Sequence, residues 1–403
     1  AGMRKAAARG FAAEAYASPR ARHPSHLVGP IRTGCPPARA TVAPDGNPVL
    51  ESTTRLTRPK SRIALPSKGR MAEDTLDLLK SCQLNVKKPN PRQYVAKIPE
   101  LPELEVWFQR ASDIVRRLGA GDVDLGILGY DMFHEFSSQI DKGDLIVVHD
   151  ELDFGHCHLA LGVPSLGEYA DVHSIDDLKA MGWRAGAGDP SKLGGRPLRV
   201  VTGYRDTAEK FFESKGLGDG QVEILAADGA LEAAPYMGCA DIILDLVSTG
   251  TTLRENNLKE IAGGRVIESQ GILVASKKSL RERSGLLEVV REMLERIEAH
   301  LAAQNFFSVT ANMRAESEAD IAQSMIAAGL CGLQGPTVAP VFSSTLRSKR
   351  LYASTVVVRK SQLHSTIRQL RKLGGSGVFV CELAYIFDDE PWRWNELQQK
   401  LAE

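Results

Sequence analysis

The sequence predicts an α/β protein with two lobes on parallel-rich sheets, arranged as in periplasmic binding proteins, followed by a smaller ferredoxin-like (ACT-like) domain. Two observations lead to this fold class. Short apolar runs alternate with helical spacing from residue 62 to about residue 284, which is typical of parallel sheets with helices on both faces. After residue 305 the order becomes βαββαβ, the ferredoxin-like pattern. A helix with one apolar stripe, expected over 285–304, links the two parts.

Each element of the two lobes is predicted from its own residues. Apolar runs predict strands at 62–66, 105–109, 198–202, 222–225, 241–247, 265–268 and 272–275, and one more within 121–131. Helical spacing predicts helices at 71–82, 111–118, 206–215 and 253–261. The strands at 265–268 and 272–275 are expected to return to the first lobe. That lobe then comprises 61–157 with 265–284, and the second comprises 158–264.

The C-terminal part, 305–395, is expected to form a domain of its own. Strands are predicted at 306–313, 338–342, 352–358 and 378–387, and helices at 318–328 and 362–373. This domain shows no paired acids and no His/Cys cluster, so the sequence assigns it no chemistry of its own.

The composition limits the classes of function. The 403 residues are 43% hydrophobic and 25% charged, with no net charge, which is ordinary for a globular protein. Residues 1–60 hold ten Lys or Arg and three acids, which leaves 40 basic and 47 acidic residues elsewhere. A chain that acidic is a poor candidate for nucleic-acid binding. No apolar run reaches the roughly 18 residues that span a bilayer, so no membrane partner is expected.

The six cysteines lie far apart and form no CxxC pair. This spacing argues against a disulfide framework and against a zinc site. We expect reduced and mostly buried thiols, and no metal held by a cluster of side chains.

Residues 1–60 are expected to lie outside the fold. They are rich in Ala, Arg, Pro, Ser and Thr, poor in acids, and show no sustained apolar period. That composition is typical of an organelle transit peptide, of a plastid more than of a mitochondrion. A disordered basic tail is the alternative interpretation.

One stretch, Asp241 to Leu253, carries the most informative pattern. Its apolar first half predicts a buried strand, and Asp245 is expected near the carboxyl end of that strand. The strand is followed by Ser248-Thr249-Gly250-Thr251-Thr252. Backbone N–H groups and hydroxyls at the start of a helix form a seat for a phosphate. The acid before them suits a pair of sugar hydroxyls, so the stretch suggests a ribose 5-phosphate. A plain helix N-cap is the alternative.

Two further turns have features of anion or nucleotide sites. Lys68-Gly69-Arg70 stands between a predicted strand and a predicted helix, where two cations and a helix start favour an anion. Gly129 and Asp131 follow a buried strand, with the acid expected to be exposed. Glycine there suggests close approach of a ligand to the backbone, although ordinary turn chemistry would also explain it.

The wider pattern resembles the signature of the ATP phosphoribosyltransferase family. The matching residues, at fixed spacing, are Glu232, Gly238, Ala240, Asp245, Thr249, Gly250, Thr252 and Leu253. The resemblance covers about residues 60–395 and is to the long form of the enzyme, with a C-terminal regulatory domain. It implies that Ser248 to Thr252 hold the 5-phosphate of phosphoribosyl pyrophosphate. It also implies that Asp245 holds the ribose. Glu232 is the candidate catalytic base, and a structural acid that caps a nearby helix is the alternative interpretation.

The same resemblance implies the remaining partners. The reaction is attack of adenine N1 of ATP on C1 of phosphoribosyl pyrophosphate, the first step of histidine biosynthesis, with Mg²⁺ on the pyrophosphate. Lys68, Gly69, Arg70, Gly129 and Asp131 would meet nucleotide or diphosphate. Histidine would inhibit through the C-terminal domain near Gly335, Thr337 and Ser376.

The family also implies a homo-oligomer, a hexamer, and the N-terminal composition points to the chloroplast stroma. A different class stays open from the residues alone, because a two-lobed module could bind a small anion without catalysis.

Overall fold

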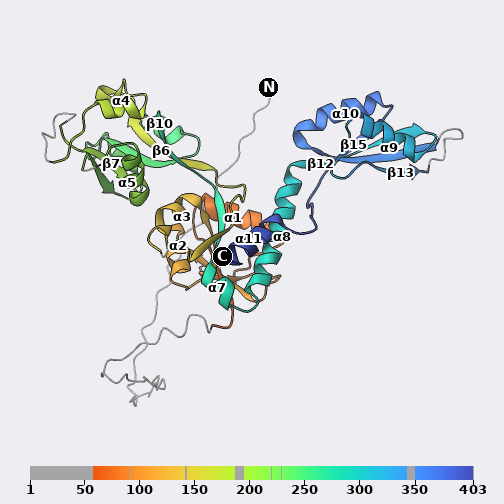
Figure 1. The fold of residues 1–403 in the computed structure, drawn as a ribbon, viewed down its shortest axis with the longest axis horizontal. Helices are drawn as coiled ribbons and strands as arrows, with labels where there is room; N and C mark the ends of the chain where they lie inside the picture. The colour runs from red at the N-terminus through yellow and green to blue at the C-terminus, as the bar shows by residue number, and fades with distance from the viewer. Residues whose placement is uncertain are drawn as a thin grey trace, which may run out of the picture. The chain divides into compact units, whose positions relative to one another are not determined.

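The computed structural model of the chain describes residues 58–402 apart from residues 91, 141–142, 187–194, 219, 228 and 343–349 (Figure 1). The transit-peptide prediction for 1–60 therefore falls almost wholly outside the described residues. Residues 58–60 are the exception, and they belong to the fold. The Arg58 guanidinium lies 2.6 Å from the carboxylate of Asp124, which is fully buried.

The first sheet has six strands in the order β2-β3-β1-β4-β11-β5. They are β1 (Ser61–Pro66), β2 (Val95–Lys97), β3 (Leu104–Gln109), β4 (Leu125–Gly129), β5 (Leu145–His149) and β11 (Gly271–Ser276). The central strand β1 runs parallel to β3 and β4, whereas β2, β11 and β5 pair antiparallel with their neighbours. The α/β class is confirmed, with mixed rather than purely parallel sheets.

Helices cover both faces of this sheet because its strands are apolar on both sides. Ile63 and Leu65 face one core, in which α1 (Arg70–Ser81), α8 (Leu286–Gln304) and α11 (Trp392–Ala402) pack. Ala64 faces the other core, which contains α2 (Ala111–Gly119) and α3 (Tyr130–Ser137). The short helix α7 (Lys277–Glu282) leads from β11 into α8.

The second sheet has five strands in the order β10-β6-β9-β7-β8. They are β6 (Cys157–Pro164), β7 (Leu198–Thr202), β8 (Val222–Ala226), β9 (Ile242–Val247) and β10 (Leu258–Ser269). One face packs on α4 (Ile175–Ala180) and α5 (Arg205–Ser214). The other face carries Ile243 and Val247 and meets Leu231 and the short helix α6 (Thr251–Glu255).

The C-terminal domain has the predicted ferredoxin-like order. It consists of β12 (Phe306–Ala315), α9 (Glu318–Ala327), β13 (Thr337–Val341), β14 (Arg350–Arg359), α10 (Leu363–Lys372) and β15 (Ser376–Glu382). The antiparallel sheet has the order β13-β14-β12-β15. Residues of both helices share one core with the sheet, so α9 and α10 cover the same face (Figure 1).

The strand expected over 378–387 runs instead from Ser376 to Glu382, and three other assignments differ from those predicted. The helix expected over 253–261 ends at Glu255, because Asn257 takes a positive φ of 54° and β10 begins at Leu258. Residues 265–269 pair with β6 in the second sheet, so only 271 onward returns to the first. After the C-terminal domain the chain returns to the first sheet, where Trp394 and Leu397 of α11 are buried in the core.

No helix within the described residues is long and apolar enough to cross a membrane. The expectation of mostly buried thiols is wrong. Cys82 is buried and Cys157 half-buried, whereas Cys239, Cys331 and Cys381 are exposed.

Candidate functional site

Two segments cross between the two sheets and lie against each other. The first, residues 150–156, leads from β5 to β6, and the second, Ser269 to Gly271, leads from β10 to β11. Gly271 anchors the contact: its carbonyl accepts from the Leu152 N–H at 3.1 Å, and its N–H donates to the Phe154 carbonyl at 2.9 Å. The Asp153 N–H donates to Gln270 Oε1 at 3.3 Å. These crossing segments therefore form one hydrogen-bonded unit.

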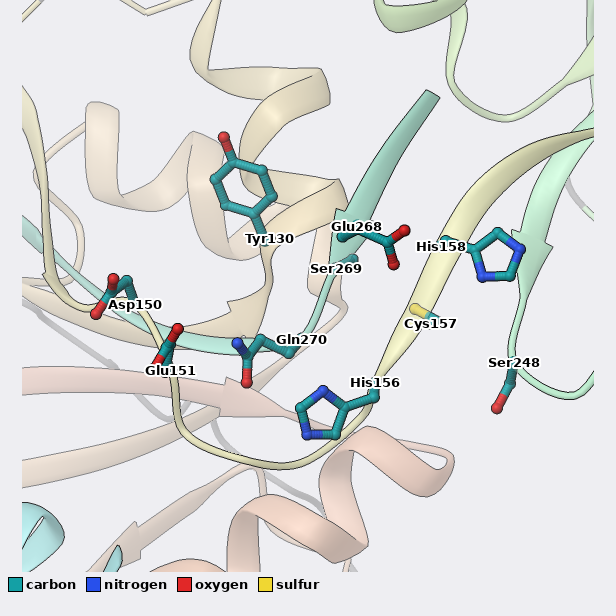
Figure 2. Close-up of a pocket in the computed structure, with 10 residues that line it drawn as sticks. All are labelled: Tyr130, Asp150, Glu151, His156, Cys157, His158, Ser248, Glu268, Ser269 and Gln270. Carbon is teal, nitrogen blue, oxygen red and sulfur yellow. The ribbon is translucent and has the colours of Figure 1, made fainter. Parts of the chain in front are cut away.

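A cavity of about 410 Å³ opens at the crossing segments (Figure 2). It is lined by Tyr130, Asp150, Glu151, His156, Cys157, His158, Ser248, Glu268, Ser269 and Gln270. In Figure 2, Asp150 and Glu151 lie at one end of this group and Ser248 at the other. The lining holds three carboxylates and neither Lys nor Arg. A polyanion would therefore enter only with a cation of its own or with basic side chains from nearby turns.

Asp245 is the fourth of the six residues of β9 and is half-buried. Its Oδ1 accepts from the Leu246 N–H at 2.8 Å. Burial raises the pKa of Asp245, the hydrogen bond opposes this, and the nearby negative charge of Glu232 raises it further. Glu232 stands in a short 3₁₀ turn, Leu231–Ala233, and is half-buried. The two predicted acids thus lie near enough for the charge of Glu232 to act on Asp245, although Asp245 lies two residues before the end of its strand.

The loop after β9 is exposed at Ser248, Thr249, Thr251 and Thr252. Gly250 has φ +68°, which an L side chain rarely adopts, so glycine is required there. The sequence-based reasoning missed Arg254. Its guanidinium reaches back over the loop and donates to the Thr249 carbonyl at 3.2 Å and to Thr251 Oγ1 at 3.1 Å. Arg254 therefore adds a positive charge to the predicted phosphate seat.

The Lys68-Gly69-Arg70 turn is exposed and opens α1, with Gly69 at φ +75°. The next residue, Met71, lies close to two other glycines of the site. A Cβ at Gly155 would lie 2.9 Å from Met71 Cε, and one at Gly129 would lie 3.5 Å from it. The basic turn therefore stands beside the first crossing segment and the end of β4.

Asp131 is buried, contrary to the exposed acid that was expected. Its Oδ1 accepts from Ser269 Oγ at 2.7 Å and its Oδ2 accepts from Tyr204 Oη at 2.8 Å. A side chain at Gly129 would overlap the Asp131 carboxylate, which explains this glycine by packing. Asp131 is engaged by protein donors and does not present its oxygens to the cavity.

Helix α3, which carries Asp131, makes further polar contacts with α5. We call the contacts between these two helices the α3–α5 junction. The buried carboxylate of Glu135 accepts from the Asp206 and Thr207 N–H groups at 2.9 Å each, and so caps the start of α5. His134 Nδ1 lies 3.0 Å from Thr207 Oγ1. Burial lowers the pKa of His134, with Lys210 acting in the same direction. Because Asp131 and Glu135 start from one helix, they connect the two sheets at neighbouring points.

The predicted site is thus brought together only in part. Of the predicted ligand residues, Ser248 reaches the cavity, whereas Glu232 lies near enough to Asp245 for its negative charge to raise the pKa of Asp245. The second crossing segment was not predicted as part of the site. Its signal was the polar triplet Glu268-Ser269-Gln270 between two apolar strands.

The predicted regulatory residues lie at opposite edges of the C-terminal sheet. Gly335 and Thr337 are at the β13 edge and Ser376 is at the β15 edge. Two strands lie between them, a separation of roughly 14 Å at the usual spacing. A small ligand cannot reach both edges within one domain.

Among the residues that the structure describes, no group of three or more His, Cys, Asp or Glu side chains could hold a metal ion. Any metal at the cavity would thus rely on ligands other than a protein cage.

The fold and this site define a two-lobed α/β ligand-binding protein with an added ferredoxin-like domain. Comparison with known families gives the particular assignment. The family model "ATP phosphoribosyltransferase" matches residues 110–299, and "HisG, C-terminal domain" matches residues 303–385.

Three related proteins carry the same name as the family model. The chain is 50% identical to "ATP phosphoribosyltransferase 2, chloroplastic" of Arabidopsis thaliana over 359 residues, 88% of this chain and 84% of that protein. It is 50% identical to "ATP phosphoribosyltransferase 1, chloroplastic" of the same plant over 348 residues, 86% and 82%. It is 37% identical to "ATP phosphoribosyltransferase" of Brucella melitensis over 240 residues, 59% and 97%.

The chain belongs to the ATP phosphoribosyltransferase family, in the long form that carries the C-terminal domain. It is accordingly a phosphoribosyltransferase that acts at the first step of histidine biosynthesis. The alternative of a binding module without catalysis is not favoured.

Proposed function

We propose that the stretch from Asp245 to Thr252 holds the phosphoribosyl group while adenine N1 of ATP attacks C1 of phosphoribosyl pyrophosphate. One observation carries the proposal: a half-buried acid is followed within three residues by an exposed hydroxyl loop that reaches the cavity at Ser248. The N–H groups and hydroxyls of Ser248 to Thr252 would bind the 5-phosphate, and Arg254 would offset its charge.

Asp245 would accept hydrogen bonds from the ribose hydroxyls. Its raised pKa supports this role, because burial and the negative charge of Glu232 disfavour the ionised carboxylate. Hydroxyl donors would stabilise that form. Glu232 is the second catalytic candidate, and it would either share the ribose or take the proton released from adenine.

Lys68, Gly69 and Arg70 would bind the diphosphate or the nucleotide, and the backbone at Gly129 would approach the base. The transition state is oxocarbenium-like, with negative charge growing on the leaving pyrophosphate. Two exposed cations at the start of α1 can meet that charge. Catalysis would then consist of positioning and charge stabilisation.

Mg²⁺ would enter bound to the pyrophosphate. The donor set fits, because Glu151 and Glu268 are carboxylates of the cavity lining and Mg²⁺ prefers oxygen ligands while keeping several waters. These side chains would hold the hydrated ion through its waters. When bound, the ion neutralises pyrophosphate and improves it as a leaving group.

Histidine would inhibit through the C-terminal domain, near Gly335 and Thr337. Ser376 lies at the other edge of the sheet, so a site containing all three would need a second copy of the chain. This is consistent with a homo-oligomer, a hexamer in the family. Thr337→Val should weaken histidine inhibition and leave kcat and both KM values nearly unchanged. Loss of activity together with inhibition would assign the turn to folding instead.

The plastid stroma is the proposed location. The acid-poor composition of residues 1–60 supports it, as do the chloroplastic names of the two plant relatives.

Pyrophosphate release tests the assignment of roles. Release should require both ATP and phosphoribosyl pyrophosphate, and Mg²⁺ in excess of both. Asp245→Asn should lower kcat/KM for phosphoribosyl pyrophosphate roughly ten- to a hundred-fold, as expected for hydrogen bonds worth about 1.5–3 kcal/mol. The melting temperature should hardly change. Unchanged kinetics with a large loss of stability would make Asp245 a structural residue.

A further inference from the structure

Arg393 of α11 is a buried cation that contacts the wall of the cavity. Its side chain is 9% exposed. Nε and Nη2 lie 2.8 and 2.7 Å from Asp150 Oδ1, and Nη2 lies 3.9 Å from Glu151 Oε2. Asp150 and Glu151 are the first two residues of the first crossing segment and line the catalytic cavity. Arg393 therefore binds Asp150 closely at that end of the cavity and attracts the neighbouring Glu151 from a longer distance.

The same guanidinium also reaches the helix that leads to the C-terminal domain. Nη1 of Arg393 lies 3.5 Å from Glu298 Oε1. Glu298 stands in the last two turns of α8, which ends at Gln304, and β12 begins at Phe306. The Ile386 N–H, beyond β15, donates to the Ala299 carbonyl at 2.9 Å. The end of α8 is thus tied to both ends of the C-terminal domain.

The carboxylates that Arg393 contacts differ in their exposure to solvent. Asp150 and Glu151 have side chains that are 61% and 68% exposed, so without a partner they would be solvated and mobile. Burial raises the pKa of Asp150, but the hydrogen bond and charge of Arg393 outweigh this and lower it. Glu298 is 14% exposed, and burial raises its pKa against the opposing effect of Arg393. Arg393 therefore contacts two exposed carboxylates and one half-buried carboxylate at once.

We propose that Arg393 is a positioning residue that fixes the Asp150–Glu151 wall of the catalytic cavity to the end of α8. The consequence is a direct mechanical link between the C-terminal domain and the crossing segments. A shift of the last turns of α8 moves Glu298 and, through Arg393, the cavity wall. The inference rests on the proposed catalytic use of this cavity.

The test needs a variant that does not strand a buried charge. Arg393→Met alone leaves Glu298 unpaired, which is costly, so Arg393→Met/Glu298→Gln is compared with Glu298→Gln. Arg291→Met is the matched control. Arg291 is 52% exposed on α8, pairs with Glu390 at 3.1 Å, and stacks near Trp394.

The kinetic expectation is a loss of about tenfold in kcat/KM for Arg393→Met/Glu298→Gln, since a misplaced wall costs at least that much. Asp150→Asn should give a similar loss and add little to the double variant, because both changes break one contact. Arg291→Met should stay within about twofold of wild type. An unchanged double variant, or a full additional loss from Asp150→Asn, would overturn the inference. Should the double variant fold poorly, Arg393→Lys keeps the charge beside Glu298 and should show a smaller loss of the same kind.

A second readout does not depend on activity. The Leu152 and Asp153 amides are hydrogen-bonded across the crossing segments. Their hydrogen exchange should quicken in Arg393→Met/Glu298→Gln and stay as in wild type in Arg291→Met. Unchanged exchange refutes the positioning role. If the wild-type protein itself releases no pyrophosphate, faster exchange in the double variant would leave the mechanical link standing and refute the proposed function.

Discussion

Removing one oxygen atom at the α3–α5 junction should destabilise the protein without touching its ligand sites. Tyr204 Oη donates to the Asp131 carboxylate at 2.8 Å, and the two residues are 6% and 4% exposed. Burial and the charge of Asp131 raise the pKa of Tyr204, so the phenol stays protonated and donates at all accessible pH values. Tyr204→Phe deletes the donor and leaves the ring in place.

The expected loss of stability follows from the hydrogen bonds that Asp131 retains in Tyr204→Phe. Ser269 Oγ still donates to Oδ1 at 2.7 Å, but Oδ2 loses its donor in a buried position. A lost hydrogen bond to a charged buried group costs about 1.5–3 kcal/mol. For a large domain this corresponds to a decrease in melting temperature of roughly 3–10 °C.

Thermal unfolding of Tyr204→Phe is the assay, with Tyr94→Phe as control because Tyr94 is 64% exposed. KM for ATP should change little, because Asp131 is enclosed by protein donors. A Tyr204→Phe enzyme that melts like wild type would refute the reasoning. An Asp131→Asn enzyme with normal stability and a raised KM for ATP would then restore the nucleotide contact that the sequence suggested.

Three further predictions test other parts of the fold. A chain that starts at residue 58 should melt like the full chain, whereas one that starts at residue 61 should melt lower, because it lacks the Arg58–Asp124 ion pair; equal melting would place the domain boundary later. Burial, reinforced by Asp131, raises the pKa of Cys157 to about 11, so iodoacetamide at pH 8 should label exposed Cys239 before Cys157, as peptide mass spectrometry can show. Burial lowers the pKa of His149 to about 3. Below about pH 6.5 the unfolded chain therefore binds one proton more than the folded chain. The free energy of unfolding should decrease as the pH is lowered below 6.5, by up to ~1.4 kcal/mol per pH unit, and less steeply in His149→Asn.

Local patterns predicted the elements whose burial is decided by their own residues. The strand at 198–202 and the helix expected over 285–304 were predicted to within a residue, because each has an apolar pattern of one period. The strand at 265–268 was assigned to the wrong sheet for a different reason. Its partner strand, β6, stands about a hundred residues earlier in the chain, and nothing in Arg265 to Glu268 encodes that partner.

The C-terminal helix α11 was not predicted, because most of its residues are polar and only three of them are buried. Arg393, Trp394 and Leu397 are buried in α11, whose remaining side chains are mostly polar. Their burial depends on α8 and β5, which approach from elsewhere in the chain. Sequence spacing alone shows neither that core nor the ion pairs of Arg393.

Two acids beside strand ends show where sequence reasoning reaches its limit. Asp131 and Asp245 both belong to apolar strand-and-turn stretches, and both were interpreted as ligand contacts. Tertiary structure separates them. Asp131 meets a phenol 73 residues away and a hydroxyl 138 residues away, so its oxygens are satisfied by the protein. Asp245 accepts only a local backbone N–H among its described hydrogen bonds, and a second acid raises its pKa. A half-buried carboxylate with spare acceptor capacity is stabilised by a ligand that brings hydroxyl donors, which is why we propose Asp245, and not Asp131, as the ribose contact.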